Sequence, residues 1–270
     1  MKFSHFLKAT GIQALADIRP QLLGASALNL IIVPALWVFL GRTMSRNIPN
    51  LDVSAGHFLI AGSLVGMSTL VASQIASEVY NEFTAGVLLR VRTLPHGVKI
   101  WSAAKLATAS AIILASQLLI LIATIVFIPA FELTWAKVAL AVPFLLLVIL
   151  AAAPLGFIVG AVTRSLWSYL IGVLALTGLL IISGIFFPLT VLPGWVQVIS
   201  QVFPVYHAGV VSRWIFIGSN ENVLASVLVL TAWLIVGMMV AWKLVEVSFR
   251  KVSLGQVARA QQKMKTMMGM

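Results

Sequence analysis

The side chains that could carry acid–base, nucleophilic or metal chemistry are few in this chain. It has seven Asp and Glu residues, four histidines and no cysteine, and these carboxylates and histidines all lie outside the long apolar stretches. The lack of cysteine excludes disulfides, thiolate metal sites and a cysteine nucleophile. No Ser–His pair or His–carboxylate set stands at membrane depth, and no G-x-x-x-x-G-K-[ST] phosphate loop occurs. We therefore expect a chain that is not an enzyme and that binds no metal or cofactor itself.

The charged residues include one regularly spaced set, in residues 78–92. Read as a helix, this segment has an acidic row in its first turns and Arg90 and Arg92 in its last, as the helix dipole favours. An apolar row and the acidic row each repeat every four residues: Val79, Phe83 and Val87, and Glu78 and Glu82. The spacing predicts an amphipathic helix that Pro95 stops.

Two interpretations of this predicted helix stay open from its residues alone. It could lie on the inner leaflet of a membrane. It could instead dock into a groove of a cytoplasmic partner, with Phe83 as an aromatic anchor inside a charged rim.

A second irregular segment follows, rich in proline and aromatic residues. From Trp195 onward, apolar and polar residues alternate as on two faces of a short helix, and residues 204–218 are apolar but too short to cross a membrane. We expect a re-entrant pair of half-helices over residues 188–218 at the outer face. The alternative is a long aromatic-rich loop at the level of the lipid headgroups.

The elements that must position these segments are membrane spans. The chain is 61% hydrophobic and 9% charged, with a mean hydropathy of +1.07, which excludes a soluble globule. A span needs about 20 apolar residues. Stretches of that length without Asp, Glu, Lys or Arg are residues 22–40, 58–77, 106–128, 138–162, 169–187 and 223–242. We predict an all-α polytopic membrane protein with six transmembrane helices.

The positive charges orient these spans. With the N-terminus inside, the inner segments carry fourteen of the 18 Lys and Arg residues and the outer segments four, so both termini are predicted to be cytoplasmic. Residues 1–21 then form an N-terminal cytoplasmic amphipathic segment, 22–245 the transmembrane domain and 246–270 a basic tail. Anionic lipids would attract the tail by about 1 kcal/mol per cation near the surface, so the net charge of +11 requires no nucleic-acid partner.

The predicted spans carry small and weakly polar residues in place of charges. Gly62 and Gly66, and later Gly156 and Gly160, recur at a spacing of four, a pattern typical of closely packed membrane helices. A second interpretation is a path for an amphipathic substrate. Its lining would be Asn29, Trp37, Ser73, Gln74 and Gln117.

The two irregular segments resemble the signature regions of the ABC type-2 exporter permeases, membrane subunits that pair with separate ATPases. The family's inner pattern E-x-x-x-G-[TS]-x-x-x-L…T-P…K-L is similar to Glu82, Gly86, Leu89, Thr93, Pro95, Lys105 and Leu106. Its outer pattern G-x-F-F-P-x-x-x-L-P-x-W…P-x-x-Y is similar to Gly184, Phe186, Phe187, Pro188, Leu192, Pro193, Trp195, Pro204 and Tyr206. Val87 stands where the family usually has Thr or Ser, and Tyr206 sits one residue earlier than usual.

This resemblance implies a permease of the bacterial plasma (inner) membrane, driven by two copies of an ABC ATPase subunit that carry ATP and Mg. A second permease protomer, identical to the first, is also implied. The segment 78–92 resembles the coupling helix that seats in the ATPase, and the implied contacts are Glu78, Glu82, Phe83, Gly86, Val87, Leu89, Arg90 and Arg92. The implied outer gate comprises Gly184, Phe186, Phe187, Pro188, Pro193 and Trp195.

Within this family, the chain most resembles the drug and lipid-like-molecule exporters of the daunorubicin-resistance type. The expected function is export of an amphipathic drug or lipid-like molecule from the cytoplasm or the inner leaflet. Polysaccharide and teichoic-acid exporters share the same core and are one alternative. A passive or ion-driven transporter with six spans is the other.

Overall fold

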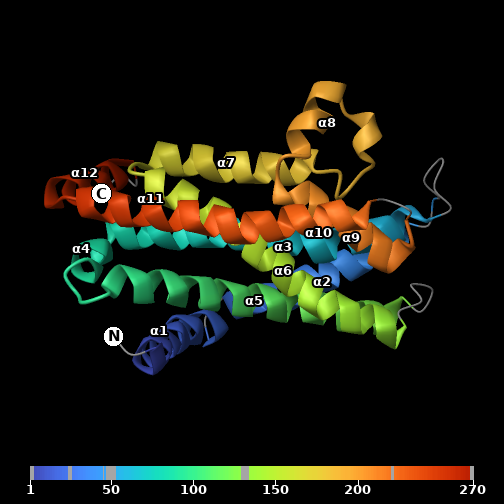
Figure 1. Cartoon of the computed structure of the whole chain (residues 1–270), viewed down its shortest axis with the longest axis horizontal. Coiled ribbons are helices and arrows are strands. Elements are labelled where there is room, and N and C mark those ends of the chain that lie inside the picture. The colour runs from blue at the N-terminus through green and yellow to red at the C-terminus, as the bar shows by residue number, and fades with distance from the viewer. Residues whose placement is uncertain are drawn as a thin grey trace.

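The computed structural model describes residues 3–23, 26–44, 46, 53–128, 134–219 and 222–267. The regular structure of these residues is helical, which confirms the predicted all-α class. The long helices lie side by side in an elongated bundle (Figure 1). Both ends of the chain lie at the end of the bundle that carries the short helix α4 (Val87–Val91).

Each predicted span falls on a helix, and four of these helices are long and apolar enough to cross a membrane. They are α3 (Ala55–Thr84), α5 (Gly97–Phe127), α6 (Trp135–Val162) and the continuous helix Val223–Lys251. The last consists of α10 (Val223–Ala232), the π-helical η3 (Trp233–Gly237) and α11 (Met238–Lys251). The other two predicted spans fall on shorter apolar helices, α2 (Ser26–Thr43) and α7 (Leu166–Ile182). The chain is therefore a polytopic membrane protein. That six of its helices span the membrane stays a prediction.

Helix α3 is the core of the bundle, with 78% of its most apolar stretch buried. It approaches α6 at glycines: a Cβ atom on Gly156 would lie 2.3 Å from the backbone oxygen of Ala72. It approaches the segment after α7 in the same way, since a Cβ atom on Gly62 would lie 2.2 Å from the oxygen of Ile185. The predicted use of small residues for close helix packing is confirmed at these positions.

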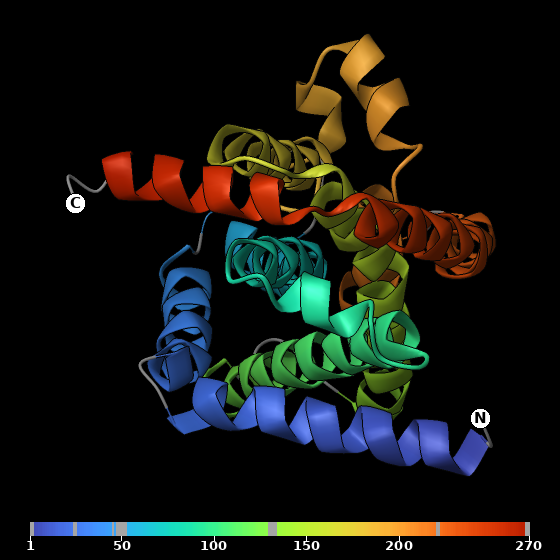
Figure 2. The ribbon, with the colours of Figure 1, turned by 90° about the vertical axis from the view of Figure 1, so that its left-hand side faces the viewer.

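Two helices lie flat across the end of the bundle. Figure 2 shows α1 (Phe3–Leu23) on one side of α4 and α12 (Leu254–Met267) on the other. Helix α1 packs on α5, and α12 packs on the end of α3. The segments predicted to be the N-terminal and C-terminal cytoplasmic parts are thus both mainly helical over their described residues, with Val252 and Ser253 between α11 and α12. The side chains of Lys263 and Lys265, part of the predicted basic tail, lie outside the described residues.

Three helix boundaries differ from the prediction. The segment 78–92 is not one helix, because α3 continues to Thr84 and α4 begins only at Val87, after Gly86 with a φ of 76°. A glycine in this left-handed conformation ends a helix at little cost. Gly184 has a φ of 72°, and α7 ends at Ile182 rather than at residue 187. The last long helix runs to Lys251, beyond the predicted end at residue 242.

Residues 184–218, predicted to lie at the outer face and here called the outer segment, form three helices. These are η2 (Leu189–Val191), α8 (Gly194–Ser200) and α9 (Pro204–Ile217). Helix α8 stands out from the bundle (Figure 1), and its apolar residues Trp195, Val198 and Ile199 are exposed. Helix α9 is largely buried, and its Ser212 hydroxyl donates to the oxygen of Ala61 in α3 at 2.7 Å. The chain therefore returns into the bundle after α8, while its re-entry into a membrane stays a prediction.

Candidate functional site

A compact turn of residues 85–97, here called the elbow, joins α3 to α5. Gly86 reverses the chain after α3, and the N–H of Arg92 donates to the oxygen of Leu88 at 3.2 Å to close α4. Gly97 then starts α5 so close to α4 that an added Cβ atom would lie 2.1 Å from the oxygen of Val91. A larger residue at this position would push α5 away from α4.

The elbow exposes only some of the side chains predicted for docking. Phe83 is only 1% exposed, so its ring does not lie on the surface of the elbow, and its role as an anchor for a partner stays a prediction. The physical reason is that α3 continues through Phe83 and buries it against Phe249 of α11 and Val257 of α12, in one cluster. Leu89 is half-buried. The exposed residues of the elbow include Val87, Arg90, Arg92, Leu94 and Pro95.

Glu78 and Glu82 are half-buried and form a charge cluster, and their place in the rim of a docking surface stays a prediction. Both pair with Lys105 of α5, whose side chain is 5% exposed. The distances from Lys105 Nζ are 2.7 Å to Asp17 Oδ2, 3.4 Å to Glu78 Oε2 and 2.5 Å to Glu82 Oε1. A buried ammonium group needs such partners to offset the loss of its hydration.

Neutral donors complete the charge cluster. The Trp101 indole N–H donates to Glu82 Oε2 at 2.5 Å, and the Gln74 amide donates to Glu78 Oε1 at 3.2 Å. The Gln21 amide of α1 donates to the same Glu78 oxygen at 3.3 Å. Through these contacts the cluster joins α1, α3 and α5 at the base of the elbow.

Arg164, in the turn between α6 and α7, supports the elbow from beneath. Its guanidinium carbon lies 5.4 Å from the centre of the Phe83 ring, within the range of a cation–π contact. It also donates to the hydroxyl of Ser248 in α11, and to the oxygen of Thr163 at 2.5 Å. Burial lowers the pKa of Arg164, although a guanidinium stays charged in proteins. Arg164 therefore links the elbow to α11.

The predicted outer-gate residues divide into two groups. Gly184 and Phe186 belong to the bundle: the oxygen of Gly184 accepts from Arg213 Nη1 at 3.2 Å, and Phe186 stacks on Trp37 of α2 with ring centres 5.4 Å apart. Phe187 and Pro188 are half-buried nearby in sequence. Pro193 and Trp195 are exposed at the start of the protruding α8.

The predicted substrate-path residues do not line one path. Gln117 is fully buried and donates to the Ser68 hydroxyl and to the oxygen of Leu64 at 2.8 Å, because a buried amide needs partners. Gln74 belongs to the charge cluster and Trp37 to the outer ring stack. Ser73 is half-buried, and the side chain of Asn29 lies outside the described residues.

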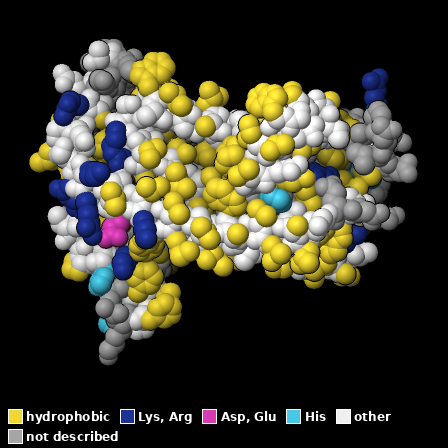
Figure 3. Space-filling model, turned by 45° about the horizontal axis from the view of Figure 1, so that its top comes forward, with side chains coloured by type: hydrophobic (Ala, Val, Ile, Leu, Met, Phe, Trp, Pro, Cys, Tyr) yellow, Lys and Arg dark blue, Asp and Glu magenta, His cyan; other side chains and the backbone are white. Residues whose placement is uncertain are grey.

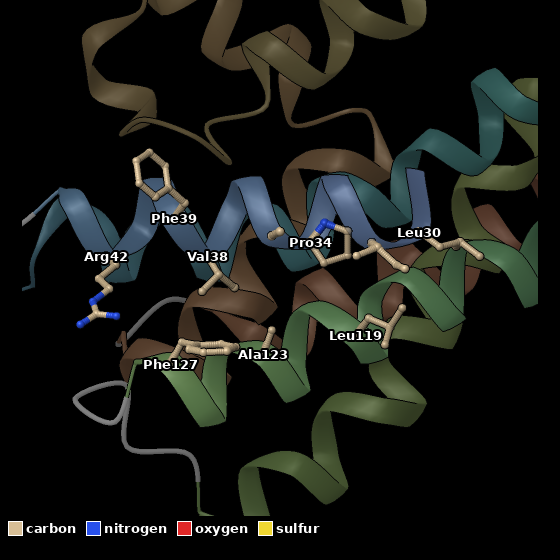
Figure 4. A pocket seen from close by; sticks show the side chains of 10 residues that line it. Leu30, Pro34, Val38, Phe39, Arg42, Leu119, Ala123 and Phe127 are labelled. Carbon is tan, nitrogen blue, oxygen red and sulfur yellow. The ribbon is translucent and has the colours of Figure 1, made fainter. Parts of the chain in front are cut away.

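An apolar groove of about 400 Å³ lies between α2 and α5 (Figure 4). Arg42 lies at one end of it and Leu30 at the other. Among the described residues, Arg42 makes no ion pair. The residues between these ends include Pro34, Val38, Leu119, Ala123 and Phe127.

Comparison with known families agrees with this arrangement. The family model described as ABC-2 type transporter matches residues 21–217, which is most of the chain and includes the elbow and α9. The chain belongs to the ABC-2 type transporter family. ABC-2 permeases are the transmembrane subunits of ABC transporters and work with an ATPase subunit. A comparison with curated proteins gives no match.

Several residues of this ABC-2 permease that hold the elbow were not among the predicted site residues. Lys105 stood in the inner sequence pattern, but its pairing with Glu82 was not predicted. Arg164 carried a weaker signal, because it is the one Lys or Arg residue between the fourth and fifth predicted spans, 138–162 and 169–187. No sequence pattern pointed to Asp17, Trp101 or Ser248, because their roles depend on which helices meet.

Proposed function

We propose that this ABC-2 permease exports an amphipathic drug or lipid-like molecule from the cytoplasm or the inner leaflet. Two copies of a separate ATPase subunit, which carry ATP and Mg, would drive it in the bacterial plasma membrane. The observation that carries the proposal is the elbow, an exposed turn at the end of the bundle where both chain ends lie, next to the ion pairs that join α1, α3 and α5.

The contacts of the elbow support a coupling role. Val87, Arg90 and Leu94 are the exposed residues that would seat in the ATPase. Beneath them, the charge cluster ties the end of α3 to α5, and Arg164 contacts Phe83 at the same end of α3. Closure of the two ATPases would therefore move these helices as a body rather than bend a loop.

Helix α3 would carry this movement to the outer side. Its C-terminal end leads into the elbow, and its Gly62 and Gly66 lie against Ile185 and Phe186 of the outer segment. A shift of α3 would then disturb the stacking of Phe186 on Trp37. In this proposal that ring stack, with Gly184 as the bend beside it, is the outer gate.

The groove between α2 and α5 supports an amphipathic substrate. Its apolar walls suit a hydrocarbon chain, and Arg42 at its end suits an anionic headgroup (Figure 4). A strongly charged polymer would need several charged partners, and the lining of this groove has one charged side chain, Arg42. This observation favours drug or lipid-like molecules over polysaccharides.

The surface of α7 supports a second permease protomer. None of the residues of α7 is buried, and Trp167, Ile171 and Leu174 are each about two-thirds exposed or more. An apolar helix at the side of the bundle suits an interface with another copy of the chain.

The test is association with the ATPase subunit, measured by extracting the tagged chain from its own host in mild detergent. Mass spectrometry would identify the partner, and the mass of the complex would give the stoichiometry, expected to be two copies of each subunit. We expect Val87→Asp to weaken association about tenfold or more, because it places a charge without a partner in the docking surface. The matched control is Val191→Asp, an exposed valine in the outer segment, which should leave association unchanged.

Either of two results would count against the proposal. If the wild-type chain is extracted without a nucleotide-binding subunit, a passive or ion-driven transporter becomes the better account. If the subunit associates equally with Val87→Asp and the wild type, the elbow is not the docking surface.

A further inference from the structure

The C-terminal helix α12 packs directly on the elbow. Val257 and Ala260 of α12 are buried in the same apolar cluster as Phe83 and Leu88. Gly86, where the chain reverses, has the side chain of Val257 as the nearest neighbour of a Cβ atom, at 3.8 Å. The tail is therefore part of the fold around the elbow rather than a separate extension.

Polar contacts hold the tail on both sides of Gly86. On one side, the Gln261 amide donates to the backbone oxygen of Thr84 at 2.8 Å. This oxygen lies in the last turn of α3, where carbonyl groups lack partners within the helix. On the other side, Arg92 Nη1 donates to the oxygen of Val252 at 2.5 Å. The tail thus bridges the elbow from its beginning to the end of α4.

The elbow and α12 together make a basic surface. Neither residues 85–97 nor residues 254–267 contain Asp or Glu. Arg90 of the elbow and Arg259 of α12 are exposed, as is Lys251 at the end of α11. Figure 3 shows Lys and Arg side chains gathered at this end of the molecule, with an acidic side chain among them. Such a surface fits an acidic partner.

We infer that α12 and the elbow form one composite docking surface for an acidic face of the ATPase subunit, with α12 as a clamp that holds the elbow in place. This inference rests on the proposed function. The position of the clamp favours the ATPase over anionic lipids, because Gln261 bonds Thr84 directly before the elbow and Val257 lies beside Gly86 within it. A tail that only attracted lipid would need neither contact.

The test is the affinity of the purified chain for its co-purified ATPase subunit, in detergent and at two salt concentrations. Ending the chain after Val252, or replacing Val257 by Asp, should lower affinity about tenfold or more, and Gln261→Ala two- to tenfold, the effect of one hydrogen bond. Higher salt should weaken the wild-type complex. The matched controls are Gln262→Ala, an exposed neighbour of Gln261 on α12, and Val191→Asp, which adds a charge far from the elbow in the outer segment; both should bind as the wild type does.

The outcomes separate this inference from the proposed function. If the wild type does not bind the ATPase, the proposed function fails. If it binds and the shortened chain, Val257→Asp and Gln261→Ala bind equally well, the composite surface is wrong. Vesicles with anionic lipid test the lipid alternative: if these variants bind such vesicles less tightly than the wild type but bind the ATPase equally well, the inference is also wrong. If the first two variants do not elute as folded protein, Gln261→Ala decides, because it leaves the apolar cluster intact.

Discussion

At the residue scale, Lys105 holds together the end of the bundle that carries α4. It neutralises carboxylates from α1 and α3 that would otherwise repel one another within a few ångströms. Glu82 and Lys105 were both visible in the sequence pattern, but a pattern records only that residues recur. Their contact requires the turn at Gly86 and Gly97 that brings the end of α3 back to the start of α5.

Replacing Lys105 by Met should lower the free energy of unfolding by on the order of 3 kcal/mol, because it leaves uncompensated carboxylates in a half-buried site. The measurement is thermal unfolding of the purified protein in detergent. The control is Arg250→Gln, which removes an exposed i,i+4 pair with Glu246 (76% and 44% exposed side chains) and should cost about 1 kcal/mol or less.

A rescue experiment tests the cause of this loss. Adding Glu78→Gln and Glu82→Gln to Lys105→Met removes the repulsion and should recover part of the stability. If Lys105→Met is as stable as Arg250→Gln, the cluster does not hold the three helices together.

At the element scale, the sequence predicted where helices lie better than where they end. The apolar row Val79, Phe83 and Val87 was interpreted as an independent amphipathic helix. Val79 and Phe83 in fact extend the buried face of α3, following Ile75 at the same spacing of four. Periodicity cannot distinguish these cases, because it does not show that α11 and α12 cover this face.

The contact between α3 and α6 depends on glycine. Gly156→Ala would place a methyl group 2.3 Å from the oxygen of Ala72 and 2.8 Å from its Cα atom, so the two helix backbones must separate. We expect a loss of about 1–3 kcal/mol, as for an overpacked core, measured as a lower melting temperature. Gly178→Ala in α7, where no atom lies within 4 Å of the added Cβ, should be neutral or stabilising by up to about 1 kcal/mol. Equal effects of the two substitutions would show that this close approach is absent.

At the scale of the whole molecule, α3 connects the elbow to the outer segment. Composition and hydropathy predicted the membrane-protein class. The positive charges predicted that both termini are cytoplasmic, which stays a prediction, and both chain ends lie at the same end of the bundle (Figure 1). The clamp by α12 and the separation of the predicted path residues could not be predicted, since both depend on contacts between helices far apart in the sequence. If α3 transmits movement in this way, the elbows of two protomers should shift together when ATP binds.

The most direct measurement of this claim is the distance between two elbows. The chain has no cysteine, so Thr93→Cys, an exposed elbow position, gives one spin label per protomer in the complex with the ATPase. We predict one intermolecular distance in the nucleotide-free complex and a different distance with ATP bound and hydrolysis blocked. No dipolar coupling, or the same distance in both states, would contradict the account.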